Sequence, residues 1–352
     1  MTPIRVCFLI PGMSDGGAQK QCIYLLNELA RRDDVEPYLI HFYSGVHDHL
    51  LKAENIRIER LAVRSNYNPA NILRLREVLT RIQPDILLSW LHACDTYAFF
   101  LRRLVPRVRW IMTERNSFYT PDPRFWLRRH LGRHADAIIA NSPQGSEYWR
   151  KAAARGPRFV IPNIVPGSPT TKIARTRSAI HIGRLEPQKN VVTVARAFCI
   201  VAARRPDLSF SFIGEGSLRR ELDTIVRNAG LSDRVTFLGF KSDVSSHILR
   251  AGAVVSMSHH EGLPNVLLES IALNTPIVAS DIPEHRDLLG PEYVHYVERR
   301  NDPEACAIAI EKALHAEDSA SFEFARSKIA GMRPEVIGDM YVNVFRNLRT
   351  GD

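Results

Sequence analysis

The chain has 352 residues, of which 45% are hydrophobic and 24% charged, and its formal net charge is +9. The composition is that of an ordinary globular protein, and the length favours two domains because single cores stop growing at roughly 250–300 residues. No run approaches the ~18 apolar residues of a membrane-spanning helix, and the apolar opening "VCFLIP" is too short for a signal peptide. The sequence therefore predicts a protein that is neither secreted nor integral to a membrane.

Short β-branched runs alternate with longer amphipathic runs through the first half of the chain. Strands are predicted at "IRVCFLI" (4–10), "EPYLIHF", "PDILLSWL" (84–91) and "ADAIIANS" (135–142). Helices are predicted at "AQKQCIYLLNELARR" (18–32) and "NILRLREVLTRI" (71–82). Strands that alternate with helices indicate βαβ units and a parallel sheet.

The text changes at 162–178 to "PNIVPGSPTTKIARTRS", whose Pro, Gly, Ser and Thr indicate an interdomain crossing. The same alternation then restarts with "SAIHIGRL", "LSFSFIGEG", "RVTFLGF", "AGAVVSMS" and "PIVAS" as strands. We therefore expect an α/β fold of two Rossmann-like, doubly wound parallel-sheet domains that face a cleft. The expected domains are 1–165 and 175–334, with a C-terminal helix at 335–352 packing back on the first.

The five cysteines are scattered along the chain and odd in number. This pattern argues for a reducing compartment and against a disulfide framework or a zinc site. The adjacent His259 and His260 would point to opposite sides of an extended segment, so they are poor joint ligands. We expect no metal site.

The stretch "SHHEGLPNVLLES" (258–270) carries two carboxylates, Glu261 and Glu269, around the expected start of a helix at 263–264. Pro264 suits a first helical turn because its missing N–H would have no partner there. A helix start with free N–H groups and a positive dipole end suits phosphate, and a carboxylate accepts hydrogen bonds from a diol. The expected backbone contacts are at Gly262, Leu263, Asn265 and Val266. In isolation, the two carboxylates would be interpreted as a cap-region charge, Glu261, and a surface residue, Glu269.

Two loops add candidate phosphate contacts. "IGRLEPQKN" places Gly183, Arg184 and Lys189 after the strand that opens the second domain, where two cations suit a diphosphate. "PGMSDGGAQ" places Gly16 and Gly17 between the first strand and the first helix, where bare backbone could face a phosphate. Neither domain completes the GxGxxG spacing, which argues against an NAD site.

The ordered set of motifs resembles the retaining GT-B glycosyltransferases of the glycosyl transferases group 1 family. The second-domain matches are "HIGRLEPQKN", "FSFIGEGSLRREL", "RVTFLGF", "EGLPNVLLES" and "TPIVASDIPEHRDLL". The first-domain matches are "PGMSDGGAQKQ", "ANSPQGSEYW" and "VIPNIV", so the resemblance covers nearly the whole chain. It implies a nucleotide-sugar donor bound mainly to the second domain.

The resemblance also implies residue roles. Glu261 would act on the transferred sugar, and Glu269 would hold the ribose diol. Arg184 and Lys189 would neutralise the diphosphate, so that the reaction needs no metal or other cofactor. The anomeric configuration would be retained, with a UDP- or GDP-linked hexose or N-acetylhexosamine as donor.

One departure from the family pattern concerns the first domain, where many members carry a His. Here the matching stretch is "MTERN", with Glu114, Arg115 and Asn116. His92, at the end of an expected strand, could cover the missing catalytic His or be merely structural. In the second domain, Glu284 and Asn274 stand where Gly is frequent, which could alter either sugar fit or loop shape.

Two segments, "RRLVPRVRW" (102–110) and "RFWLRRHLGRH" (124–134), mix cations with apolar residues. They suit an anionic membrane surface, although a merely solvated basic face is the leading interpretation and nucleic acid ranks last. The resemblance to polysaccharide-assembly members implies a glycan acceptor on a polyprenyl diphosphate, in exopolysaccharide or lipopolysaccharide synthesis. The protein would then be cytoplasmic and peripheral on the inner face of the cytoplasmic membrane. The alternatives are a sugar-nucleotide epimerase or hydrolase, or a basic nucleic-acid-binding protein; no nucleic-acid-binding module is recognised, so nucleic acid is not an expected partner.

Overall fold

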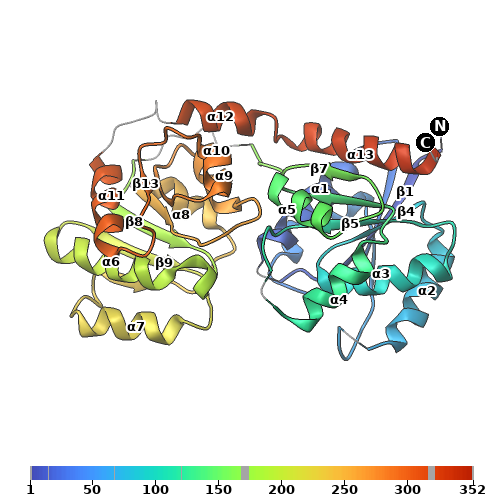
Figure 1. Ribbon diagram of the computed structural model, residues 1–352, viewed down its shortest axis with the longest axis horizontal. Coiled ribbons are helices and arrows are strands. Elements are labelled where there is room, and N and C mark those ends of the chain that lie inside the picture. The colour runs from blue at the N-terminus through green and yellow to red at the C-terminus, as the bar shows by residue number, and fades with distance from the viewer. Residues whose placement is uncertain are drawn as a thin grey trace. The chain divides into compact units, whose positions relative to one another are not determined.

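The computed structural model describes residues 2–14, 16–66, 68–119, 121–167, 174–315 and 322–350. The chain divides into two compact units: unit 1 comprises Met1–Ile164 and Met332–Asp352, and unit 2 comprises Val165–Gly331. Each unit is a β-sheet with helices packed on it (Figure 1). Part of the predicted interdomain crossing, 168–173, lies outside the described residues.

Unit 1 has a seven-stranded sheet in its described part, ordered β3-β2-β1-β4-β5-β6-β7, and all neighbouring strands run parallel. The strands are β1 (Ile4–Gly12), β2 (Val35–Tyr43), β3 (Arg57–Arg60), β4 (Ile86–Ser89), β5 (Arg109–Glu114), β6 (Ala137–Ala140) and β7 (Arg158–Val160). The α-helices are α1 (Gly17–Leu29), α2 (Ala70–Ile82), α3 (His92–Leu104), α4 (Pro123–Gly132), α5 (Pro143–Lys151) and α13 (Pro334–Thr350).

Unit 2 has a six-stranded parallel sheet in its described part, ordered β10-β9-β8-β11-β12-β13. The strands are β8 (Ser178–Ile182), β9 (Ser209–Ile213), β10 (Val235–Phe237), β11 (Ala253–Ser256), β12 (Ile277–Ser280) and β13 (Tyr296–Val297). The α-helices are α6 (Val191–Arg204), α7 (Arg219–Asn228), α8 (Val244–Arg250), α9 (Asn265–Ala272), α10 (Pro283–Leu289), α11 (Pro303–His315) and α12 (Glu323–Ala330).

The two strand orders confirm the predicted pair of doubly wound parallel sheets. Each order reverses once, between β1 and β4 in unit 1 and between β8 and β11 in unit 2. Ligands of open parallel sheets bind beyond the carboxyl ends of the strands at such a reversal. The loops after these four strands are therefore where function is to be sought.

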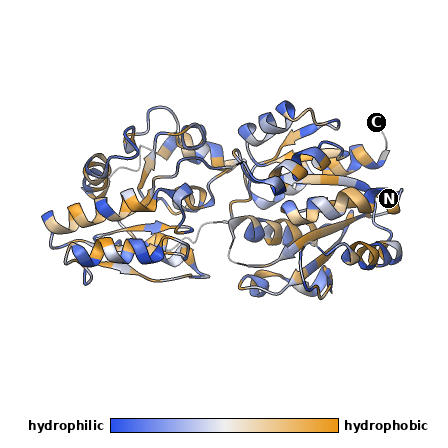
Figure 2. Ribbon diagram, turned by 60° about the horizontal axis from the view of Figure 1, so that its bottom comes forward, coloured by the Kyte–Doolittle hydropathy of each residue, from blue (hydrophilic) through white to orange (hydrophobic). Residues whose placement is uncertain are grey.

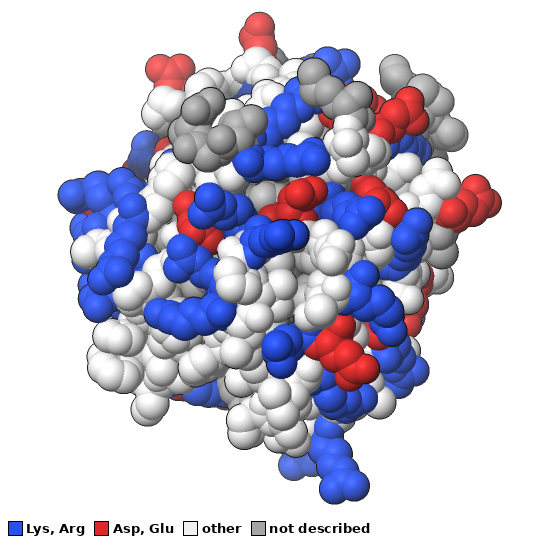
Figure 3. Space-filling model, turned by 90° about the vertical axis from the view of Figure 1, so that its right-hand side faces the viewer, with Lys and Arg blue, Asp and Glu red and all other residues white. Residues whose placement is uncertain are grey.

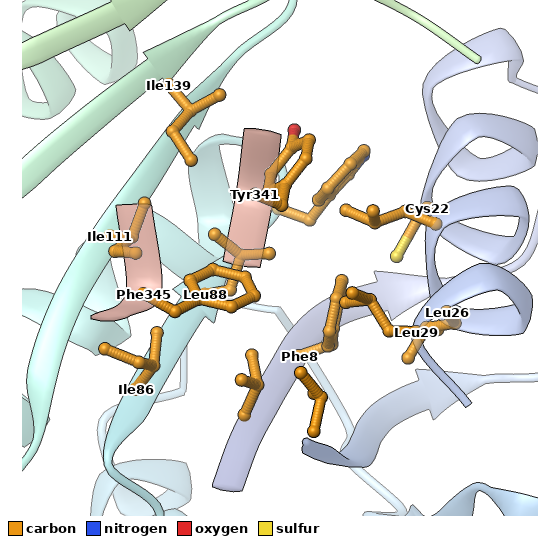
Figure 4. Close-up of a cluster of buried hydrophobic side chains, with 14 of the residues drawn as sticks. Phe8, Cys22, Leu26, Leu29, Ile86, Leu88, Ile111, Ile139, Tyr341 and Phe345 are labelled. Atoms are coloured by element: carbon orange, nitrogen blue, oxygen red, sulfur yellow. The ribbon is translucent and has the colours of Figure 1, made fainter. Parts of the chain in front are cut away.

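Apolar strands lie at the centre of each unit, while the helices turn polar residues outward (Figure 2). Such buried strands read as continuous apolar runs because helices cover both sheet faces. The core of unit 1 includes a contribution from the end of the chain. Tyr341 and Phe345 of α13 are buried in the same cluster as Phe8 and Leu88 (Figure 4). The C-terminal helix is thus part of the hydrophobic core of unit 1.

Candidate functional site

The loops after β8 and β11 meet at the strand-order reversal of unit 2. Lys189 ends a short 3-10 helix, Pro187–Lys189, and its ammonium forms an ion pair with Glu261. The same Glu261 Oε1 accepts a 2.6 Å hydrogen bond from Ser258 Oγ, and Glu261 is only 6% exposed. Two residues that were expected to contact different parts of the donor therefore form one ion pair, in which Glu261 is buried and Lys189 is half-buried.

The charge on Glu261 is stabilised by its surroundings. Burial by itself would raise the pKa of this carboxyl, but the Lys189 ammonium and the hydrogen bonds from Lys189 and Ser258 outweigh burial. Its pKa therefore lies below the usual value, and Glu261 is ionised at neutral pH. An ionised, fixed carboxylate can accept hydroxyl hydrogen bonds or stabilise a developing positive charge.

Gln188 ties the two loops together. Its carbonyl accepts from the His259 amide at 2.9 Å, and its side-chain Nε2 donates to the His260 carbonyl at 3.0 Å. Its Oε1 accepts from the exposed Arg184 guanidinium at 3.0 Å. The loop with Arg184 and Lys189 is thus held against the loop with Glu261.

The start of α9 differs by one residue from the prediction. Pro264 is the N-cap, with extended ψ of 103°, and the helix begins at Asn265. The first helical bonds run from the Leu267 and Leu268 amides to the Pro264 carbonyl. The Asn265 and Val266 amides precede these bonds and lie at the positive end of the helix dipole. Gly262 is buried and Leu263 half-buried in the loop just before them.

Glu269 is the fifth residue of α9 and is half-buried. The helix therefore separates the two carboxylates of the motif as predicted, with Glu261 before its first turn and Glu269 inside it. Asn274 follows α9 with a left-handed φ of 55°, and its carbonyl and Oδ1 accept from Arg175 and Arg326. Asn is one of the few non-Gly residues that tolerate this region, so Asn274 shapes a turn.

Gly183 has a φ of 153° and keeps the end of β8 open. A Cβ there would lie 3.6 Å from His181 Nε2 and 3.7 Å from Lys189 Cε. Any side chain would thus stand beside Lys189, in a conformation that L-residues rarely adopt. The predicted Gly183, Arg184 and Lys189 are brought together with Glu261.

In unit 1 the loops after β1 and β4 also meet. Gly16 is the N-cap of α1 and Gly17 its first residue, while Trp90 Nε1 donates to the Ala18 carbonyl at 2.8 Å. His92 is the first residue of α3, half-buried, with its ring 5.8 Å from that of Phe125. Burial, and then the Arg128 and Arg124 charges, lower the pKa of His92, which makes its neutral form the prevailing one at pH 7.

Glu114 is a structural centre, which excludes it as a direct replacement for the family's first-domain His. It is fully buried, and Oε1 accepts from the Arg115 and Asn116 amides at 2.8 and 2.9 Å. Oε2 accepts from Arg128 and from Trp149 Nε1, both at 2.7 Å. Arg115 in turn stacks on the Trp90 ring and donates to Asn163 and Tyr341. These contacts fix the loop after β5.

The basic segments are only partly at the surface. Trp110 is buried, and the buried Arg128 pairs with Asp95 and Glu114, so neither can contact a membrane. On α4, Trp126 is 69% exposed and Arg129 is exposed. Lys and Arg spread over one face of unit 1, with fewer Asp and Glu among them (Figure 3).

Four residues of the site were not predicted from the sequence: Ser258, Gln188, His181 and His285. A signal existed for His181 and Ser258, because each is a polar residue within or just after an otherwise apolar, buried strand. Within the described ranges, no cluster of three His, Cys, Asp or Glu side chains could hold a metal ion. Within the same ranges, every helix is too short or too polar to cross a membrane.

Two family models match the chain: Glycosyltransferase Family 4 over residues 15–166 and Glycosyl transferases group 1 over residues 170–325. The lipopolysaccharide core biosynthesis glycosyltransferase LpsE of Rhizobium meliloti is 25% identical over 276 residues, which are 76% of each chain. An α-1,4-N-acetyl-D-galactosaminyltransferase of Campylobacter jejuni, named for a diNAcBac-PP-undecaprenol-linked glycan, is 24% identical over 76% of this chain and 77% of its own.

Solved structures share the fold at low sequence identity. Anabaena HepE in complex with UDP and glucose has a TM-score of 0.81 and 18% identity, covering 97% of this chain and 99% of its own. Sucrose-phosphate synthase of Thermosynechococcus elongatus has a TM-score of 0.82 and 17% identity, covering 99% and 100%. With one family model on each unit and the reversal-point loops carrying the motifs, the chain belongs to the glycosyl transferases group 1 family and is a GT-B glycosyltransferase.

Proposed function

We propose that this protein is a retaining, metal-independent glycosyltransferase that transfers a hexose or N-acetylhexosamine from a UDP- or GDP-sugar to a lipid-linked glycan. Its role would be the assembly of lipopolysaccharide or another surface polysaccharide. The observation that carries the proposal is the ion pair between Lys189 and the buried Glu261 at the strand-order reversal of unit 2, with Arg184 on the same loop. The LpsE relative supports the polysaccharide role, and the HepE complex with UDP and glucose supports a UDP-sugar.

The donor is held through three kinds of contact. Arg184 and Lys189 neutralise the diphosphate, and the amides at the start of α9 add hydrogen bonds to phosphate oxygens. Glu261 accepts hydroxyl hydrogen bonds from the transferred sugar, and Glu269 accepts them from the ribose.

The residues act mainly by orientation and charge stabilisation. The bond between the sugar's C1 and the diphosphate oxygen breaks, and the electron pair leaves with the diphosphate, whose charge Arg184 and Lys189 stabilise. The acceptor hydroxyl bonds to C1 on the same face and its proton passes to the departing diphosphate.

The acceptor side of the proposal rests on unit 1. Trp126 and Arg129 on α4, together with the basic face of unit 1, suit an anionic membrane surface in which the lipid carrier lies. The Campylobacter relative named for a PP-undecaprenol glycan supports this acceptor class. The site would then work on the inner face of the cytoplasmic membrane.

Calorimetric titration with UDP, GDP and their common sugars, in the presence of EDTA, tests the donor site. We expect one nucleotide class to bind and to raise the melting temperature, because a ligand of the folded state stabilises that state. Lys189→Ala should abolish most of this stabilisation, while Lys241→Ala, on an exposed loop of unit 2, serves as the matched control. Binding that requires added divalent metal, or that survives Lys189→Ala unchanged, would refute the assignment.

A further inference from the structure

Two buried histidines stand beside the Lys189–Glu261 pair. His181 lies on β8 and His285 on α10, and their exposed fractions are 1% and 0%. His181 Nδ1 is 3.0 Å from the Val255 carbonyl, and His285 Nδ1 is 2.8 Å from the Ser280 carbonyl. A carbonyl oxygen only accepts hydrogen bonds, so each Nδ1 carries the ring proton and each Nε2 carries a lone pair.

The Nε2 atoms of His181 and His285 are hydrogen-bond acceptors that no donor in the described part of the site contacts. Both are buried without a hydrogen-bond partner within the described residues. Burial lowers the pKa of each ring, that of His181 to about 4, so both rings are neutral at pH 7. The charged groups that act on His181 are Lys189 and Glu261, and those that act on His285 are the same two and Glu284.

The rings are also connected to the pair through the framework. Ser280 Oγ donates to the Ser258 carbonyl at 2.7 Å, and Ser258 Oγ donates to Glu261 Oε1 at 2.6 Å. The His181 ring and the Lys189 side chain both approach Gly183. A Cβ added to Gly183 would lie within 4 Å of His181 Nε2 and of the Lys189 side-chain carbons. The carboxyl ends of β8, β11 and β12 thus converge on one buried polar cluster.

We propose that His181 and His285 are positioning residues that hold the Lys189–Glu261 pair in its working geometry. As neutral rings locked in the Nδ1–H tautomer, they surround the pair with acceptors and add no positive charge that would compete for Glu261. The catalytic consequence of this inference rests on the proposed function, whereas the tautomers of the two rings do not depend on it.

The tautomers can be measured directly. Nitrogen-15 NMR of histidine-labelled protein at pH 7 should show two neutral rings in the Nδ1–H form, assigned by their loss in His181→Gln and His285→Gln. The other 11 of the 13 histidines remain as internal references. Imidazolium or Nε2–H signals for either ring would overturn the proposal.

Kinetic measurements give a second test. Turnover is expressed per nucleotide-binding molecule, so that a loss of folded protein does not lower the measured kcat. A Gln amide can donate to the carbonyl and still accept, so His181→Gln and His285→Gln should retain most of the wild-type kcat. The apolar His181→Leu and His285→Leu should lower kcat about tenfold or more with donor KM nearly unchanged, because a supporting shell commonly contributes this much. His49→Gln, exposed in unit 1, is the control.

The outcomes separate two failures. Wild-type kcat in both Leu variants would refute the positioning role while leaving the transferase intact. A wild-type protein that neither binds nor uses any nucleotide sugar would refute the proposed function, and the NMR result would still decide the tautomers.

Discussion

At the scale of single residues, the site works by holding a carboxylate ionised inside the protein. Glu261 is buried, yet one cation and one hydroxyl keep its pKa below the usual value. Removing one hydrogen-bond donor to Glu261 without altering the fold should weaken, but not abolish, the stabilisation of its negative charge. Ser258 is the residue to change, because its Oγ is the neutral donor to Glu261.

Ser258→Ala should raise the pKa of Glu261, since a hydrogen bond to a charged group contributes roughly 1.5–3 kcal/mol. The acid limb of the kcat/KM profile should therefore move to higher pH, measured with saturating acceptor between pH 4 and 8. Ser209→Ala, exposed at the start of β9, should leave the profile in place. An unmoved acid limb in Ser258→Ala would mean that Glu261 is not the titrating group.

His181 gives a pH dependence of stability with a defined sign. Its pKa is about 4 in the folded protein and about 6.5 when unfolded, so the folded state binds this proton less tightly. The associated stability is present above pH 6.5 and is lost as the pH falls towards 4. Between pH 7 and 4.5 the free energy of unfolding should fall by about 2 kcal/mol from this residue. In His181→Gln, urea unfolding at both pH values should show that fall removed.

At the scale of elements, α13 completes the core of unit 1. Phe345 is fully buried in that core, whereas Met340 on the same helix is 41% exposed. Phe345→Ala should lower the free energy of unfolding by about 3–5 kcal/mol through lost burial and a cavity. Met340→Ala should change it by less than about 0.5 kcal/mol. Equal effects in chemical denaturation would contradict the packing of α13 described above.

The helix α4 has one buried side and one side that faces solvent. Its buried Arg128 pairs with Asp95 and Glu114, while Trp126 and Arg129 face solvent. Arg129→Ala should weaken binding to phosphatidylglycerol vesicles about fivefold, because one Arg near an anionic surface contributes about 1 kcal/mol. Trp126→Ala should add to this loss. Cosedimentation measures both, with Val294→Ala in unit 2 as the control; unchanged binding would place the membrane contact elsewhere.

At the scale of the whole molecule, sequence patterns predicted the fold class but not every strand. The strand at 4–10 and the helices at 18–32 and 71–82 lie within a few residues of β1, α1 and α2 because their burial follows a clear period. In contrast, β3, β5, β7 and β13 were not predicted. The strands β3 and β7 are short outer strands, largely exposed, and "RIER" has no apolar alternation to recognise. The strand β13 has only two residues, and β5 begins inside the segment 102–110, which was interpreted as a basic surface segment.

The candidate site could likewise be predicted only in part. Glu261, Arg184 and Lys189 could be placed on loops from motif spacing, since βα loops lie at the carboxyl ends of strands. The ion pair between Lys189 and Glu261 could not be predicted, because it depends on how loops separated by 72 residues in the chain fold against one another. Glu114 stands where many members of the family carry a His, and only the structure shows that it is buried and accepts five hydrogen bonds.

The position of α13 has a consequence for how the protein is made. Unit 2 is one continuous segment, Val165–Gly331, whereas unit 1 needs the last stretch of the chain, Met332–Asp352, to fill its core. During synthesis from the N-terminus, unit 2 can finish folding before unit 1. A prematurely terminated product would expose Phe8 and Leu88, which α13 otherwise covers, and would be open to proteases and chaperones. Unit 1 thus depends for its stability on a segment that is synthesised only after the whole of unit 2.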